Sequence, residues 1–118
     1  MENYKLVLPE NLNQFGYLFG GYLLKFVDEI AWIAATLDYP GYHFVTIAMD
    51  QVEFRKSVRG GTILKFVCQK TKTGNTSVRY LVEVYNANVQ PADYETMFST
   101  TVTMVRVDEY GKKKPLDT

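Results

Sequence analysis

Apolar residues are densest from Gly20 to Leu37, in the stretch GGYLLKFVDEIAWIAATL. Only Lys25, Asp28 and Glu29 bring charge into this run, and almost no polar face is left. The pattern therefore predicts one long buried helix, about 27 Å in length at 1.5 Å per residue. The P-G pair of DYPGYH follows directly and ends the helix.

Alternating apolar and polar residues predict strands on both sides of this helix. A short extended segment at 4–9 precedes it, and four longer strands follow at 45–54, 62–70, 77–86 and 96–107. Successive strands with short links favour an antiparallel meander, which the helix can cover. We therefore expect an α+β fold in which an antiparallel sheet curls round one central helix. The polar tail YGKKKPLDT is expected to be frayed.

Length and composition narrow the class of protein. A chain of 118 residues predicts one domain, 1–118, and its formal net charge of zero gives no reason to expect nucleic acid or a membrane surface as partner. The single Cys68 excludes an internal disulfide and fits a reducing compartment. His43 is the only histidine, so we expect no metal site. The apolar run is too short and too charged to span a bilayer, and no signal-type segment opens the chain, so a cytoplasmic protein is expected.

One acid in the helix needs an explanation. Asp28 shares a helix face with Leu24 and Trp32, and an ionised carboxylate in apolar surroundings costs several kcal/mol unless it is paired. Glu29 has a simple structural explanation as an i,i+4 ion pair with Lys25. Asp28 could also pair with Lys25 at i,i+3, or it could have a chemical role. The residues alone leave both possibilities open.

The start of the helix offers possible donors for that chemistry. Gly20 and Gly21 free backbone N–H groups at the positive end of the helix dipole, which suits an anion or a developing oxyanion. The same glycines would also permit close helix–sheet packing. Other common catalytic motifs are missing, since the sequence has no G-x-S-x-G, no Walker loop and no G-x-G-x-x-G.

The segment from Pro9 to Glu29 follows the pattern P-x-x-x-N-x-x-G-x-x-F-G-G-x-x-L-K-x-x-D-E. This pattern resembles the start of the hotdog-fold acyl-CoA thioesterases, the acyl-CoA hydrolase family. The likeness continues through VTIAMDQVEFRKSVRGG, KTGNTSVRYLVEV and TTVTMVRVDEYGKKKPL, so it covers nearly the whole chain. The resemblance implies a hotdog fold and hydrolysis of acyl-CoA to the free acid and coenzyme A. No cofactor is implied, because coenzyme A is part of the substrate.

The resemblance also implies roles for particular residues. The family's catalytic asparagine corresponds to Asn13, three residues before Gly16, and its catalytic aspartate to Asp28, seven residues after Gly21. Asp28 would act as general base or nucleophile, and Asn13 would hold the attacking water or bind the thioester carbonyl. The N–H groups of Gly20 and Gly21 would stabilise the oxyanion. The family's dimer joins two sheets edge to edge, so Asn13 would meet Asp28 of the partner, in a homodimer or a trimer of dimers.

Contacts to the phosphates of coenzyme A require cations and backbone donors. The candidates are Arg55, Lys56, Arg59 and the turn formed by Gly74, Asn75, Thr76 and Ser77. The sequence departs from the family pattern around these contacts, at Gln14, Phe19, Ser57 and Gly61. Two other functions stay open: a non-catalytic acyl-CoA-binding protein, and a hotdog hydratase or dehydratase that would use His43.

Overall fold

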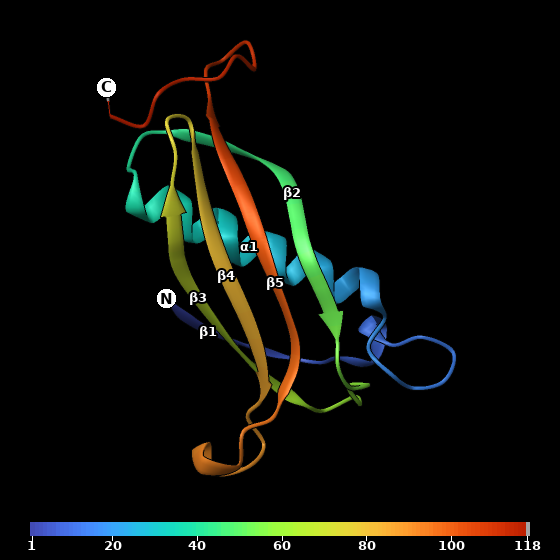
Figure 1. The fold of residues 1–118 in the computed structure, drawn as a ribbon. Coiled ribbons are helices and arrows are strands. Elements are labelled where there is room, and N and C mark those ends of the chain that lie inside the picture. Colours follow the sequence, from blue (N-terminus) through green and yellow to red (C-terminus); the bar gives the residue numbers. More distant parts are fainter. Residues whose placement is uncertain (118) are drawn as a thin grey trace.

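One long helix crosses one face of a five-stranded sheet in the computed structural model, which describes residues 1–117 (Figure 1). Residue 118, the last of the expected domain, lies outside the described part. The elements are β1 (Glu2–Leu6), α1 (Gly20–Asp38), β2 (His43–Phe54), β3 (Ile63–Thr73), β4 (Ser77–Asn86) and β5 (Thr96–Val107), with short 3-10 helices at Pro9–Asn11 and Pro91–Asp93. The predicted helix and four long strands are confirmed with small shifts of their ends. The first strand lies two residues earlier than expected.

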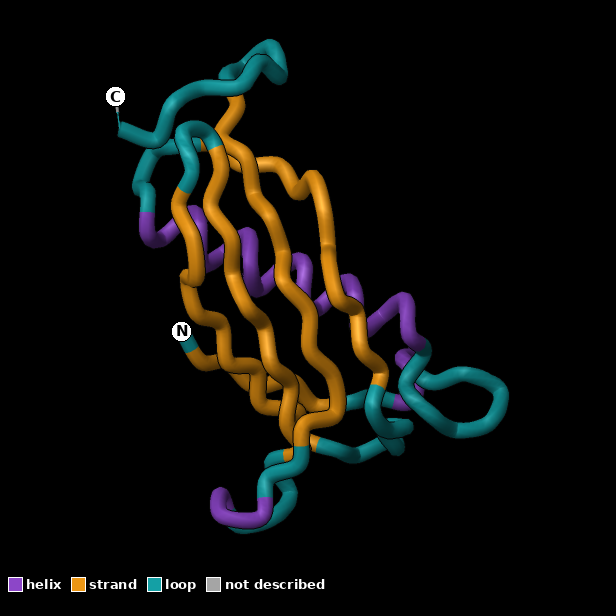
Figure 2. The backbone as a smooth tube through the Cα atoms, viewed as in Figure 1, coloured by secondary structure: helices purple, strands orange, loops and turns teal. Residues whose placement is uncertain are grey.

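The strands pair in the order β1-β3-β4-β5-β2, and every pair is antiparallel. Strands β3, β4 and β5 form the expected meander, but β2 was expected beside β3 and instead pairs with β5 (Figure 2). That expectation is wrong because residues 55–62 form a long connection rather than a hairpin turn, and β1 occupies the free side of β3. The two edges of the sheet are therefore β1 and β2.

The core lies between the inner face of α1 and the sheet. Helix residues at spacings of three and four are buried, and alternate residues of β3, β4 and β5 pack against them. The helix side chains concerned are Leu23, Val27, Ile30, Ala31, Ala34 and Ala35. Two large apolar side chains of the helix nevertheless stay exposed, since Trp32 is 45% and Leu37 67% accessible. The helix is therefore less completely buried than its composition predicts.

The tail after β5 is packed, so the prediction of fraying is wrong. Asp108 accepts hydrogen bonds from two backbone N–H groups of the following turn and reverses the chain. Lys114 then donates its N–H to Arg106 O (3.0 Å), and Leu116 donates to Asn75 O (2.9 Å). The side chain of Leu116 is buried in the core. One leucine in a polar segment is thus enough to hold it against the sheet.

Strand β2 is an irregular edge. Its register against β5 shifts twice, between Thr46 and Ala48 and again between Asp50 and Glu53. Gln51, inside the second irregularity, adopts a φ of +54°, which is uncommon for a residue other than glycine. The edge also exposes large apolar side chains, those of Val45, Ile47, Val52 and Phe54. None of the described helices has the length and apolar character needed to cross a membrane.

Candidate active site

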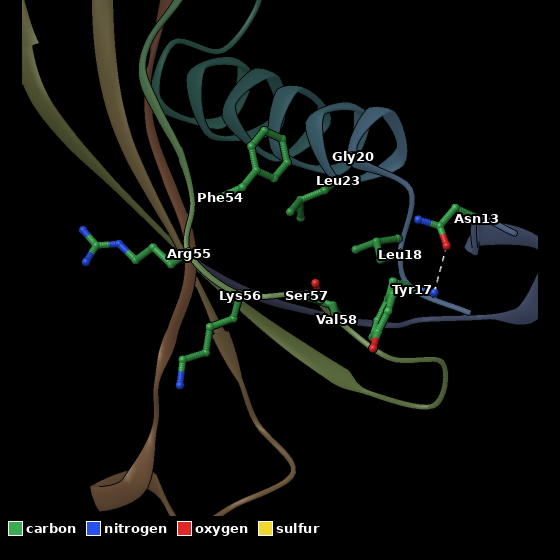
Figure 3. A pocket seen from close by; sticks show the side chains of 10 residues that line it. All are labelled: Asn13, Tyr17, Leu18, Gly20, Leu23, Phe54, Arg55, Lys56, Ser57 and Val58. Atoms are coloured by element: carbon green, nitrogen blue, oxygen red, sulfur yellow. Dashed lines mark hydrogen bonds between the residues drawn. The ribbon is translucent and has the colours of Figure 1, made fainter. Parts of the chain in front are cut away.

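A cavity of about 280 Å³ lies between the start of α1 and the segment that follows β2 (Figure 3). Three sequence segments bring residues to it: the loop before the helix, the first turn of the helix, and the end of β2 with its connection. The lining residues are Asn13, Tyr17, Leu18, Gly20, Leu23, Phe54, Arg55, Lys56, Ser57 and Val58. The cavity therefore unites four of the predicted site residues: Asn13, Gly20, Arg55 and Lys56.

The start of α1 presents unpaired backbone donors at this cavity. Phe19 is the N-cap residue and has extended backbone, and its carbonyl oxygen accepts from the N–H groups of Tyr22 (3.0 Å) and Leu23 (3.3 Å). The N–H groups of Gly20 and Gly21 find no acceptor among the residues that the structure describes. No side chain in the described part of the chain caps this helix end. Two donors and the positive end of the helix dipole are therefore available to an oxyanion.

Asn13 has its side-chain amide fixed by its own loop. Its Oδ1 accepts hydrogen bonds from the N–H groups of Phe15 (2.9 Å) and Tyr17 (3.1 Å). This assigns the oxygen to the loop, and Figure 3 shows the nitrogen turned toward the segment that leads into α1. The Nδ2 group finds no acceptor within residues 1–117. An amide nitrogen can only donate, so this geometry favours contact with a carbonyl oxygen.

The carboxylate of Asp28 is hydrogen-bonded by a residue of the sheet and not by a residue of its own helix. The hydroxyl of Thr46, on β2, donates a hydrogen bond to Asp28 Oδ1 and also contacts the sulfur of Met104 at 3.3 Å. Neither predicted ion pair with Lys25 forms: Glu29 pairs instead with Lys5 of β1 (3.3 Å). The carboxylate of Asp28 is half-buried and retains free acceptor positions on its second oxygen.

Within one chain, the carboxylate of Asp28 does not lie at the cavity with the donor groups of Asn13 and Gly20. Asp28 stands eight residues after Gly20 on α1, which is about 12 Å along the helix axis. It is not among the residues that line the cavity with Asn13 and Gly20. Within one chain, the carboxylate of Asp28 therefore lies outside the cavity that holds the donors.

The predicted phosphate contacts near the cavity are engaged in other interactions. Arg55 forms an ion pair with Glu53 (2.8 Å) and Lys56 with Glu95, and Figure 3 shows both side chains extending away from the cavity. Arg59 lies beside the ring of Tyr17, with 5.7 Å from its guanidinium carbon to the ring centroid. Arg59 has no carboxylate partner in the described part of the chain.

The predicted contact turn lies elsewhere. The turn formed by Gly74, Asn75, Thr76 and Ser77 joins β3 to β4 at the end of the sheet opposite the loop that leads into α1 (Figure 1). Its carbonyl groups contact the tail and the end of β5, since Asn75 O accepts from Leu116 of the tail and Thr76 O accepts from Arg106 of β5 (both 2.9 Å). Within one chain, this turn does not contribute to the cavity.

Two other reactive side chains lie apart from the cavity. Burial raises the pKa of Cys68 to about 11, so its thiol is protonated at neutral pH and is a poor nucleophile. His43, the first residue of β2, is exposed and lines a different hollow with Tyr42 and Arg106. No group of three potential metal ligands occurs within residues 1–117.

Thr46 is the partner of Asp28 that sequence reasoning missed. It is polar in an apolar strand, but edge strands commonly carry threonine, so the sequence alone gives no reason to single it out. Its importance appears only when β2 lies against α1 and its hydroxyl reaches Asp28, eighteen positions earlier.

The comparisons with known proteins define the class. A model of the thioesterase superfamily matches residues 15–92, and the chain belongs to this family. It is 31% identical to protein VdlD of Helicobacter pylori (strain ATCC 700392 / 26695) over 111 residues, which is 94% of this chain and 63% of that protein. The chain therefore spans less than two thirds of the length of this relative.

Solved structures give the same result for the fold. The hexameric hotdog fold thioesterase Cj0915 of Campylobacter jejuni matches with a TM-score of 0.85 and 33% identity, over 96% of this chain and 86% of that one. An acyl-CoA hydrolase of Staphylococcus aureus, in complex with butyryl coenzyme A and coenzyme A, matches with a TM-score of 0.88 and 30% identity, over 98% and 70%. Structures of that hydrolase also exist with an asparagine, an aspartate or a threonine changed to alanine. The fold of this chain is the hotdog fold.

Proposed function

We propose that the chain hydrolyses acyl-CoA thioesters to the free acid and coenzyme A. The observation that carries the proposal is a set of donors without acceptors within residues 1–117: the N–H group of Gly20 and the Nδ2 group of Asn13, which both line one cavity, and the N–H group of the next residue, Gly21. Attack on a thioester carbonyl moves negative charge onto its oxygen. Fixed donors that meet this charge commonly contribute a few kcal/mol each to transition-state stabilisation.

Asp28 supplies the second half of the chemistry. As general base it accepts a proton from water while the water oxygen bonds to the carbonyl carbon; the C–S bond then breaks and the proton passes to the thiolate of coenzyme A. As nucleophile its oxygen bonds to the carbonyl carbon and the C–S bond breaks, which gives a mixed anhydride and the thiolate of coenzyme A. Water then opens the anhydride to the free acid and the carboxylate of Asp28, and the proton passes to the thiolate. In both routes the hydrogen bond from Thr46 orients the carboxylate. Only acyl-CoA and water are consumed, so the proposed reaction requires no cofactor.

The proposed site is shared between two copies. Asp28 lies about 12 Å along α1 from Gly20, and β2 is an open edge with exposed apolar side chains. Pairing of two β2 strands about a twofold axis would cover that edge and carry Asp28 of a second copy toward Asn13. In the S. aureus hydrolase the altered asparagine and aspartate stand fifteen residues apart, as Asn13 and Asp28 do here. Cj0915 is hexameric, which is compatible with a trimer of such dimers.

The coenzyme A arm is proposed to contact cations outside the cavity. Arg59 is the first candidate because it has no carboxylate partner within residues 1–117, whereas Arg55 and Lys56 would have to leave Glu53 and Glu95. The turn from Gly74 to Ser77 could reach the same ligand only from another copy, since it lies at the far end of the sheet.

Product analysis tests the reaction. Release of free thiol from acyl-CoA supports hydrolysis. A change in double-bond absorbance without thiol release supports a hydratase or dehydratase, and binding without turnover supports a non-catalytic acyl-CoA-binding protein. The exposed position of His43, in a hollow away from the cavity, argues against the hydratase.

Mixed dimers test the shared site. Asn13→Ala and Asp28→Ala homodimers each carry one defect in every site and should be nearly inactive. After the two proteins are unfolded and refolded together in equal amounts, about half of the dimers are mixed, and each mixed dimer has one intact site. Roughly a quarter of wild-type activity should therefore return. If activity does not return although mass measurement confirms mixed dimers, both residues belong to the same chain.

A further inference from the structure

The cavity at the start of α1 has one polar and one apolar wall. Asn13 and Gly20 form the polar wall with their free donors. The apolar wall consists of Leu18, Leu23, Val58 and Phe54, whose side chains surround the same space (Figure 3). A carbonyl oxygen held at the donors would thus have an apolar space beside it.

The two arms of a thioester have opposite requirements. The coenzyme A arm carries phosphates, which need cations and water, whereas the acyl arm is apolar and gains free energy by leaving water. A space walled by core leucine and valine side chains suits the acyl arm. We propose that this cavity takes the acyl chain of the substrate and that Phe54 sets the chain length. This inference rests on the proposed function.

The volume of the cavity limits the size of that chain. About 280 Å³ is at the lower end of ligand sites, and it corresponds to about nine atoms of the size of a water molecule, at roughly 30 Å³ each. A methylene group is similar in size to water. The cavity therefore fits acyl groups of up to about eight carbons.

Phe54 is the wall residue that can set this limit. Leu18, Leu23 and Val58 are at most 9% exposed and belong to the close-packed core, so they do not give way without loss of packing. Phe54 is 54% exposed, and its ring packs edge-on against Phe98 with 4.8 Å between centroids. The same ring would lie 3.4 Å from a Cβ at Gly20, directly beside the donors. A shorter side chain at position 54 would lengthen the cavity from its open side.

The test is the chain-length profile of thiol release by the wild-type protein and by Phe54→Ala. This substitution removes six carbons from the wall, so the variant should accept longer chains. We expect the ratio of kcat/KM for a twelve-carbon over a four-carbon acyl-CoA to rise at least tenfold, since one methylene in an apolar pocket is worth about 10-fold or more. Phe54→Trp should lower the same ratio. Tyr110→Ala removes an 80% exposed aromatic ring beyond the end of β5 and should leave the ratio unchanged.

A binding measurement separates this inference from the proposed function. Alkyl-CoA thioethers are not hydrolysed. Their dissociation constants therefore report how well the cavity holds the alkyl chain, even if the protein does not hydrolyse acyl-CoA. Tighter binding of the twelve-carbon thioether by Phe54→Ala, without thiol release by the wild type, would support the cavity assignment and refute hydrolysis. Phe54→Leu, with a milder loss of packing, replaces the alanine variant if that one does not fold. Equal chain-length profiles in all folded variants would overturn the inference.

Discussion

The hydrogen bond between Thr46 and Asp28 gives the sharpest test of the proposed chemistry. Thr46→Val keeps the shape of the side chain and removes the hydroxyl that donates to the carboxylate. Hydrogen bonds to charged groups contribute about 1.5–3 kcal/mol, which corresponds to about 10- to 150-fold in rate. Because Thr46 is exposed in the single chain, solvent competes for the bond, and we expect a decrease in kcat near the lower limit, about tenfold.

The matched control is Thr46→Ser, which keeps the hydroxyl and loses one methyl group. It should retain most of the wild-type kcat, whereas KM should be similar in both variants because Thr46 does not line the cavity. Thr46→Val also removes the hydrogen bond to Asp28 from the folded protein, so its melting temperature should fall by a few degrees, whereas that of Thr46→Ser should stay near the wild-type value. The reasoning is refuted if folded Thr46→Val has the wild-type kcat, or if Thr46→Ser is equally impaired.

Three further predictions follow from the same structure. Asp28→Asn removes the charge but keeps the size of the side chain, so turnover should fall by roughly 10²–10⁴ in a folded protein. Wild-type turnover in this variant would exclude Asp28 as the base or nucleophile. Gly21→Val places a Cβ 2.9 Å from the exposed ring of Phe19, so the new side chain should crowd the donors and lower kcat more than it lowers the melting temperature. Unchanged specific activity with a large fall in melting temperature would mean that the glycine serves packing. Burial raises the pKa of Cys68 from 9.0 to about 11, which lowers the fraction of reactive thiolate at pH 8 about 100-fold. Native protein should therefore react with iodoacetamide about 100-fold more slowly than urea-unfolded protein, as measured by mass spectrometry. The stabilisation linked to this raised pKa is present below pH 9 and is lost as the pH rises through about 11.

The sequence was sufficient for local structure. The apolar run that begins at Gly20 and the P-G pair after Asp38 define α1 within one residue, and the alternation at 77–86 and 96–107 matches β4 and β5. These features depend on neighbours close in sequence. The donors at Gly20 and Gly21 were also accessible from the pattern, because every uncapped helix start leaves such groups free.

The remaining features depend on contacts between distant parts of the chain. The pairing of β2 with β5 depends on where residues 55–62 carry the chain, and Glu29 finds Lys5 rather than Lys25 because β1 lies beside the helix. Leu116 docks only because the turn after Asp108 reverses the tail. The spacing of apolar residues indicates which face of a helix or strand is apolar, but not which other element packs against that face.

The unequal edges of the sheet have a consequence for how copies of this chain accumulate. β1 has five residues and β2 has twelve, so an endless row of sheets joined head to tail would leave most of every β2 without a partner. Pairing of β2 with β2 of a second copy about a twofold axis joins two strands of equal length and leaves neither β2 edge open. Two copies joined in this way would leave only the five-residue β1 edges for further pairing of sheets, so a larger particle would depend mainly on contacts between faces. The exposed side chains of Trp32 and Leu37 on α1 provide apolar surface of the kind such contacts require.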